Sequence, residues 1–260
     1  MKTAKRRLPV LLVILLLAWV QAGAQQKKAP KEKDKAKDPQ YQVEMGSVAL
    51  NYGLIDEAIR YANIAVSLDP RHYGAQSLLG AAYFKKGLYA ESAAAYEKAG
   101  ELRPELAEIH VNLGIVYSEL DAQDKAVAEF GKAVALNGDA TAAFYLARAY
   151  YKQKRLDEAL DAVQKSIVKN GKNAGAYNLK GVILNELKRF AEAKGSFQAG
   201  LILAPTDVNL QVNLGIAYYN NNEPDKARET LEKALPHITD PPLKLKVEEY
   251  LNAIKNAEKR

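Results

Sequence analysis

Tyr145, Arg148 and Tyr151 follow one another at intervals of three residues, which places them on successive turns of one predicted helix. Tyrosine offers flat apolar area beside a polar tip and is enriched at protein interfaces. Arginine can hold a carboxylate through two parallel hydrogen bonds. Side chains of these types at this spacing are suited to noncovalent recognition of another protein.

The sequence contains no group of residues that is typical of a catalytic or metal-binding site. His72, His110 and His237 lie far apart, none pairs with another at helical spacing, and no carboxylate cluster accompanies them, so we expect no metal site. The chain has no cysteine, which excludes disulfides, zinc–thiolate sites and thiol nucleophiles. No Gly-rich phosphate loop follows a convincing strand. We therefore expect neither an enzyme nor a bound cofactor.

The elements that must carry the binding residues are pairs of helices. Leu79, Gly80 and Tyr83 share one face of a predicted helix, and residues 92–99 place small and aromatic side chains on one face of a second. Gly87 lies in the turn between them, where the end of a helix favours glycine. Two such antiparallel helices approach closely but leave one apolar flank uncovered. The unit must therefore be stacked on copies of itself.

The copies are present at a period of 34 residues, with one interval of 33. Three features recur in phase: a small residue in the first helix, a small residue that opens the second helix, and a helix breaker after it. The first-helix position is Gly46, Gly80, Gly114, Ala147, Gly181 and Gly215. The second-helix position is Ala58, Ser92, Ala126, Ala159, Ala193 and Ala227. The breaker is Pro70, Pro104, Gly138, Gly171, Pro205 and Thr239.

This period and these three series resemble the tetratricopeptide repeat family, a stack of helix-turn-helix units. The resemblance covers residues 39–241 and implies an all-α, right-handed superhelical solenoid. The six expected repeats are residues 39–72, 73–106, 107–139, 140–173, 174–207 and 208–241. Residues 242–260 are expected to form a C-terminal capping helix that covers the last repeat through Leu245, Tyr250, Leu251 and Ile254.

The resemblance also implies where a partner binds. In such stacks the first helices line a concave face, and the ligand usually lies along this face as an extended segment. The protein-binding residues predicted in this way are Phe84, Asn112, Tyr145, Arg148, Tyr151, Asn178, Asn213 and Tyr219. Asparagine carries both a donor and an acceptor, so it can pair with the backbone of an extended peptide whatever the peptide's sequence. The alternative is that these asparagines only solvate the inner face.

Chaperone-docking members of the family hold a C-terminal carboxylate with paired lysines and asparagines in successive first helices. Asn112 and Asn213 match the asparagine type, but the accompanying lysines are missing from those helices. We therefore do not expect this chain to bind a chaperone terminus in that way.

Residues 1–24 have the layout of a secretory signal peptide, with a basic start, an apolar run over residues 8–20 and a small-residue site at 22–24. The apolar run is short compared with the roughly 20 residues that span a bilayer, so we expect cleavage after Ala24. The alternative is an uncleaved helix that tethers the chain to the membrane. Residues 25–38 are rich in lysine and have no apolar face, which predicts a disordered linker. The alternative for this linker is binding of its lysines to anionic lipid or cell-wall polymer.

The positive formal net charge of +6 arises entirely before residue 39, because residues 39–260 carry 27 basic and 28 acidic side chains. A nearly neutral body lacks the electrostatic footprint of a nucleic-acid-binding protein. We expect membrane contact only through the signal segment before cleavage.

Together these features predict an exported, non-enzymatic adaptor, in the periplasm or outside the cell, that binds an extended protein segment in its concave groove. The expected partner belongs to an envelope complex such as a pilus or secretion system. In layout the chain resembles the tetratricopeptide accessory proteins of type IV pilus assembly, although it lacks their lipidated cysteine. Two alternatives remain: a self-assembling structural repeat protein, and the scaffold of an enzyme that acts on the cell wall.

Overall fold

The computed structural model describes residues 35–257, and within them it contains thirteen α-helices, one short 3-10 helix and no strand. The predicted signal peptide and most of the predicted linker lie outside the described residues. The first three repeats are α3 (Pro39–Asn51) with α4 (Ile55–Leu68), α5 (Tyr73–Lys86) with α6 (Tyr89–Leu102), and α7 (Ala107–Glu119) with α8 (Gln123–Asn137).

The next three repeats are α9 (Ala140–Lys152) with α10 (Leu156–Lys169), α11 (Ala174–Glu186) with α12 (Phe190–Leu203), and α13 (Val208–Asn220) with α14 (Pro224–Ala234). A 3-10 turn, η2 (Leu235–His237), then leads to α15 (Pro241–Ala257). Each helix packs on the next in the chain. The predicted all-α solenoid of helix pairs is therefore confirmed.

The two helices of a repeat meet where a glycine faces a bulky side chain. A Cβ added to Gly114 would lie 2.6 Å from a ring carbon of Phe130, and one added to Gly181 would lie 2.4 Å from Phe197. Ala147 replaces this glycine in the fourth repeat, and the fourth repeat has the smaller Val163 where the third has Phe130. The pairing of a smaller partner with a larger first-helix residue keeps the volume at the contact nearly constant, as close packing requires.

The residue that opens each second helix is fully buried in all six repeats. Five of these residues are alanine, and the sixth, Ser92, donates its hydroxyl hydrogen to the carbonyl oxygen of Gly80 at 2.7 Å. A buried hydroxyl without such a partner would destabilise the fold. The second small-residue series of the sequence therefore marks a position that is fully buried in every repeat.

One residue in the turn between the two helices of each repeat has left-handed backbone, with φ between 55° and 81°. Only two of the six are glycine, and the other four adopt a conformation that costs an ordinary residue roughly 1–2 kcal/mol. The six positions, at the same place in each repeat, are Gly53, Gly87, Asp121, Lys154, Lys188 and Asn222.

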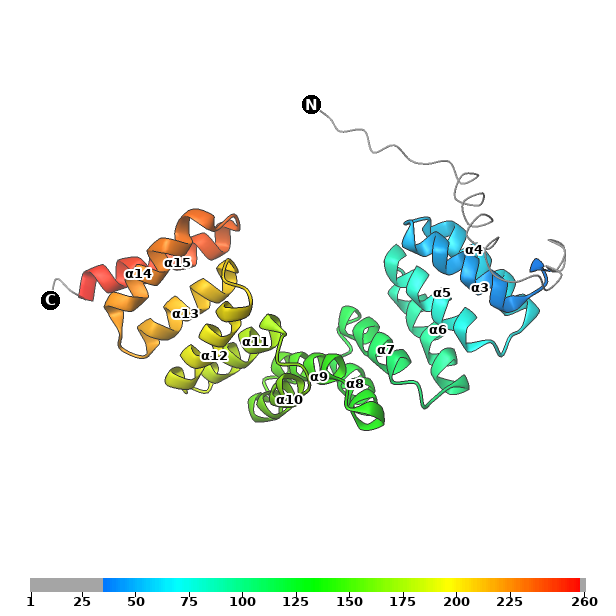
Figure 1. Ribbon diagram of the computed structural model, residues 1–260, viewed down its shortest axis with the longest axis horizontal. Coiled ribbons are helices and arrows are strands. Elements are labelled where there is room, and N and C mark those ends of the chain that lie inside the picture. The colour runs from blue at the N-terminus through cyan, green and yellow to red at the C-terminus, as the bar shows by residue number, and fades with distance from the viewer. Residues whose placement is uncertain (1–34, 258–260) are drawn as a thin grey trace, which may run out of the picture.

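The stack curves into an arch (Figure 1). First helices of neighbouring repeats contact one another directly, as in α7 with α9, α9 with α11 and α11 with α13, whereas consecutive second helices have no comparable contact among the described residues. Elements crowd on the inside of a curve, so the first helices form the concave side and α6, α8, α10 and α12 form the outer side (Figure 1).

Helix α15 covers the end of the stack, and here one detail of the prediction was wrong. Leu245 is 59% exposed, and Val247 is fully buried in its place. Leu243, Tyr250 and Leu251 pack around the buried side chains of Val247 and Ile254. The apolar face of α15 therefore contains Val247 and Ile254, and Leu245 lies outside this face.

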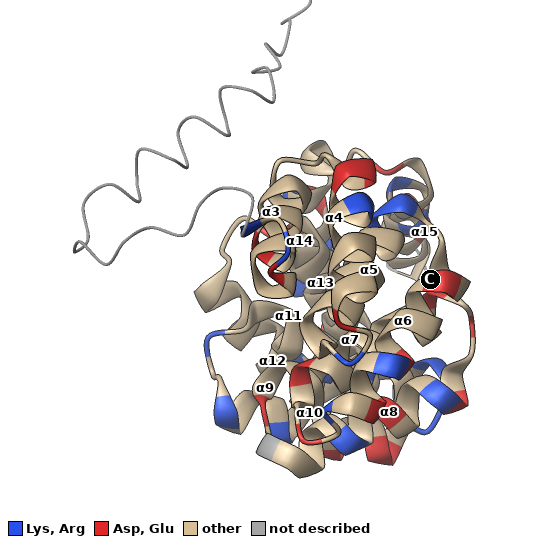
Figure 2. Cartoon of the chain, turned by 90° about the vertical axis from the view of Figure 1, so that its right-hand side faces the viewer, with Lys and Arg blue, Asp and Glu red and all other residues tan. Residues whose placement is uncertain are grey.

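Charges of both signs are interspersed over the helices in the view of Figure 2, as a nearly neutral repeat body predicts. Within residues 35–257, no helix combines the length and the apolarity that a membrane span requires.

Candidate protein-binding face

The C-terminal half of the concave face carries two asparagine pairs that join α11 to α13. The side-chain amide of Asn213 donates to the side-chain oxygen of Asn178 at 2.9 Å. The amide of Asn220 donates to the oxygen of Asn185 at 3.0 Å. Each bond is half-buried and contributes on the order of 1 kcal/mol to the contact between these repeats.

These pairs leave part of each amide available. Within the described residues, the NH₂ group of Asn178 and the side-chain oxygen of Asn213 have no protein partner in the structure. One donor and one acceptor side by side match the N–H and C=O groups of an extended peptide. The predicted asparagines Asn178 and Asn213 therefore lie together, and Asn112 lies apart from them on α7, half-buried.

Helix α9 places aromatic and cationic side chains at the middle of the arch. The ring of Tyr145 stacks on Phe130 with centroids 5.5 Å apart and meets Phe144 edge-on at 5.8 Å. The guanidinium of Arg148 lies over the rings of Phe144 and Tyr145, 5.9 Å and 5.7 Å from their centroids. One stacked ring and one edge-on ring fix the position of Tyr145, and the rings of Phe144 and Tyr145 give Arg148 an apolar support.

Arg148 is exposed, and no carboxylate of the described residues lies within ion-pairing distance of it. It lines a hollow of about 160 Å³ between α7 and α9. Ile115, Tyr145 and Phe130 give this hollow apolar walls, and Glu119 and Lys152 stand beside it. The hollow has room for one small apolar group beside a carboxylate that pairs with Arg148.

Tyr151, the third residue of the predicted α9 set, is already engaged with the next repeat. Its hydroxyl donates to Glu186 on α11, and Lys154 pairs with the same carboxylate at 2.9 Å. Burial, together with the hydrogen bond to Glu186, raises the pKa of Tyr151 to about 12. The hydrogen bond to Tyr151 and the pairing with Lys154 lower the pKa of Glu186. Tyr151 therefore joins two repeats, in contrast to Arg148.

The two predicted aromatic residues near the ends of the array also have internal contacts. Phe84 packs at a tilt against Tyr89, the first residue of α6, with centroids 5.5 Å apart. Tyr219 meets Tyr250 of α15 edge-on at 5.2 Å. Both rings are half-buried, so they contribute to packing as well as to the surface. The structure thus gathers Tyr145, Arg148 and the asparagine pairs on the inner face and places Phe84 and Tyr219 at its margins.

Besides Asn185 and Asn220, two more inner-face residues are absent from the predicted set. Lys152 lines the hollow beside Arg148, and Glu186 binds Tyr151 and Lys154. Both occupy the thirteenth position of their repeats, the same position as Glu119 and Asn220. Including the thirteenth position of each repeat among the predicted binding positions would have identified both residues.

Within the described residues, no three or more His, Asp or Glu side chains are grouped so that they could hold a metal ion. His110 has one carboxylate neighbour that the sequence did not indicate: its ring binds Glu129 at 2.7 Å. The two residues lie 19 positions apart, on α7 and α8, so helical spacing alone could not indicate the pair.

Comparisons with known proteins agree with this repeat architecture. A family model described as "TPR repeat" matches residues 80–121, and one described as "Tetratricopeptide repeat" matches residues 184–246. A model described as "Anaphase-promoting complex, cyclosome, subunit 3" matches residues 119–200. Protein O-mannosyl-transferase TMTC1 of Homo sapiens is 27% identical over 189 residues, which are 71% of this chain and 21% of that protein. The chain spans about a fifth of the length of this curated relative.

Two solved structures show the same fold. PilW, described as a widely conserved type IV pilus biogenesis factor, has a TM-score of 0.71 and 14% identity, over 80% of this chain and 97% of that one. YrrB, described as a TPR protein with an unusual peptide-binding site, has a TM-score of 0.63 and 22% identity, over 72% of this chain and 97% of that one. Tetratricopeptide repeat models thus match two parts of the chain, and its stack of helix pairs has the fold of solved tetratricopeptide repeat proteins.

Proposed function

We propose that the chain is a non-enzymatic adaptor that holds an extended protein segment along its concave face. The observation that carries this proposal is the set of unused binding groups on the first helices. Arg148 has no carboxylate partner among the described residues, and Asn178 and Asn213 each keep one polar group without a protein partner. These groups all lie on first helices, and Arg148 lies over the fixed ring of Tyr145.

The chemistry of this face defines the ligand. Amide groups pair with peptide backbone and give affinity without sequence selection. Arg148 and the apolar hollow beside it select a carboxylate next to a small apolar group. The bound segment therefore runs from the hollow between α7 and α9 across α11 to α13, with an acidic group at Arg148 and backbone contacts at the asparagine pairs.

We further propose that the protein is exported and acts in assembly of an envelope complex such as a pilus or secretion system. The signal-like layout of residues 1–24 supports export. The likeness to PilW, which covers nearly all of that structure, supports an envelope role for the fold. Recovery of the protein from its native cell and measurement of its intact mass tests export, because a species that keeps residues 1–20 would contradict cleavage after Ala24.

The binding proposal is tested with Arg148→Ala in cross-linked pull-down from extract of the native cell, with partners identified by mass spectrometry. Central arginines are over-represented among residues that dominate binding energy, so we expect a loss of about 1–2 kcal/mol, or roughly 5–30-fold in affinity. Lys188→Ala is the matched control, because Lys188 is an exposed cation in the turn after α11. Equal losses for the two variants would show that the partner uses the turns instead of the concave face.

A further inference from the structure

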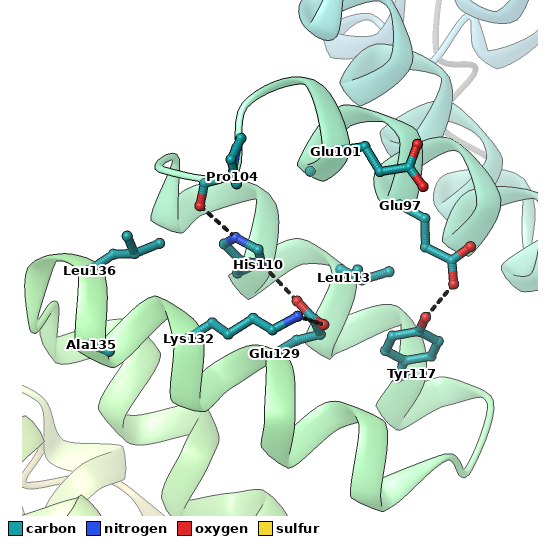
Figure 3. A pocket seen from close by; sticks show the side chains of 11 residues that line it. Glu97, Glu101, Pro104, His110, Leu113, Tyr117, Glu129, Lys132, Ala135 and Leu136 are labelled. Atoms are coloured by element: carbon teal, nitrogen blue, oxygen red, sulfur yellow. Dashed lines mark hydrogen bonds and ion pairs between the residues drawn. The ribbon is translucent and has the colours of Figure 1, made fainter.

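A second, larger hollow of about 630 Å³ lies away from the asparagine pairs, between α6, α7 and α8 (Figure 3). Leu113, Leu136 and Gly100 give it an apolar lining, and three glutamates reach its wall or rim. It lies beside the first turn of α7, at the end where the first helices begin.

The deepest charges of this hollow are compensated within the protein. His110 is 7% exposed, and its two ring nitrogens bind Glu129 at 2.7 Å and the carbonyl oxygen of Pro104 at 2.9 Å. Lys132 pairs with the other oxygen of Glu129, also at 2.7 Å (Figure 3). Glu129 therefore has two nitrogen partners and offers little unbalanced charge to a ligand.

The carboxylates at the rim on α6, in contrast to Glu129, have no cationic partner among the described residues. Glu97 accepts a hydrogen bond from the hydroxyl of Tyr117, which is a neutral donor and leaves the negative charge in place. Burial and then this contact with Glu97 raise the pKa of Tyr117. Glu101 lies one turn further along α6, is exposed, and has no cation within ion-pairing distance among the described residues. Two uncompensated negative charges thus border an apolar hollow.

An apolar hollow with carboxylates at its rim fits one kind of side chain well. Lysine has a stem of four methylene groups that packs against apolar surface while its ammonium group remains at the edge. The stem would lie along Leu113 and Leu136, and the ammonium would meet Glu97 or Glu101. An arginine stem is shorter by one carbon but has the same character.

The chain itself supplies lysines within reach. The stretch of residues 25–34, immediately before the described residues, contains Lys27, Lys28, Lys31 and Lys33. Packed helices lie roughly 8–10 Å apart, so α7, two repeats beyond α3, is on the order of 20 Å from the start of the solenoid. Ten extended residues reach roughly 33 Å. A segment joined to the solenoid also has an effective concentration on the order of millimolar at the hollow.

We propose that the hollow between α6, α7 and α8 is a lysine-binding site and that its occupant is the lysine-rich segment of residues 25–34 of the same chain. This site is separate from the concave face and is independent of the binding function proposed above.

The test is zero-length carbodiimide coupling of the chain that includes residues 25–34, which joins amines only to carboxylates in contact with them. Peptide mass spectrometry of the monomeric product should find Lys27, Lys28, Lys31 or Lys33 joined to Glu97 or Glu101. Glu91 on α6 and Glu108 on α7, both exposed, are the reference carboxylates and should couple at least fivefold less. The yield should fall severalfold in 1 M salt, because salt screens exposed charges.

The double variant Glu97→Gln with Glu101→Gln keeps the size and hydrogen bonding of both side chains and should abolish coupling at the hollow. Glu91→Gln is the matched control and should leave the coupling unchanged, and unaltered helical circular dichroism verifies folding of both variants. Equal coupling to Glu91 and Glu108 would overturn the proposal, since it would show an unattached segment. Coupling found only between chains, in a dimeric product, would overturn it too, because the occupant would then be a second copy.

Discussion

The contact between Gly114 and Phe130 predicts that the effect of Gly114→Ala on stability depends on the residue at position 130. The substitution should destabilise the protein when Phe130 is present and stabilise it when the ring is removed. In Gly114→Ala, the new Cβ lies 2.6 Å to 2.9 Å from three ring atoms of Phe130. Phe130 is only 1% exposed, so its ring cannot move out of the way into solvent. Overpacking of this kind costs typically about 1–3 kcal/mol, and alanine regains about 1 kcal/mol over glycine within a helix. The net expectation is destabilisation by up to about 2 kcal/mol.

In the Phe130→Val background the ring is absent, and the same change should instead stabilise by about 1 kcal/mol. Phe130→Val alone should cost roughly 2–3 kcal/mol, below the range for Phe→Ala because fewer atoms are removed. The double variant reproduces the pair that the fourth repeat already has, Ala147 with Val163. The two substitutions are in direct contact, so their effects are not expected to add.

Urea unfolding followed by circular dichroism at 222 nm measures all four forms, with stability taken from the midpoint and slope. Gly131→Ala is the matched control: Gly131 is on α8 and has nothing within 4 Å of an added Cβ, so it reports helix propensity alone. The proposed helix contact would be refuted if Gly114→Ala changed the free energy of unfolding by the same amount, with the same sign, in both backgrounds.

Three further predictions test other parts of the fold. Lys188→Gly should stabilise the protein by about 0.5–1 kcal/mol in urea unfolding, because glycine adopts left-handed backbone without the steric cost that lysine incurs; a loss of stability would show that the turn is not under strain. Ser92→Ala should cost about 1 kcal/mol, because it removes the buried hydrogen bond to the carbonyl of Gly80; a neutral effect would mean that this bond contributes nothing. Hydrogen bonds, with that from Lys194 the largest cause, lower the pKa of Glu223 from 4.5 to about 2. Its stabilisation is therefore present above pH 4.5 and is lost as pH falls toward 2. The melting temperature of Glu223→Gln should fall less between pH 5 and 2 than that of the wild type, and parallel curves would contradict this origin.

The repeat architecture is predictable from sequence because the contacts that hold a repeat together recur in phase. Gly114 facing Phe130 and Gly181 facing Phe197 are the same contact 67 residues apart, so one series exposes all of them. Helix α15 has no such register. The buried face of α15 could be predicted only from its own amphipathic pattern. For this reason Leu245 was assigned to the face that Val247 occupies.

The candidate site is less predictable. The position of a residue within its repeat predicts on which face of the helix its side chain lies, but not which side chain it contacts. Asn178 binds Asn213 across 35 residues, and Tyr151 binds Glu186 across the same distance in sequence. These contacts depend on the small rotation between adjacent repeats, which no single repeat encodes. Arg148 and Tyr145 were identified as binding residues from their types and spacing, and their binding role stays a prediction.

The central claim, that the concave face holds a protein partner, is tested most directly by site-specific photo-cross-linking in the native cell. A photo-reactive phenylalanine analogue placed at Asn112, on the inner helix α7, should capture a partner. The same analogue at Ala128, exposed on the outer helix α8, should not. Addition of Arg148→Ala should reduce capture from position 112 roughly 5–30-fold. Capture of the same partner from position 128 alone, unaffected by Arg148→Ala, would contradict the account.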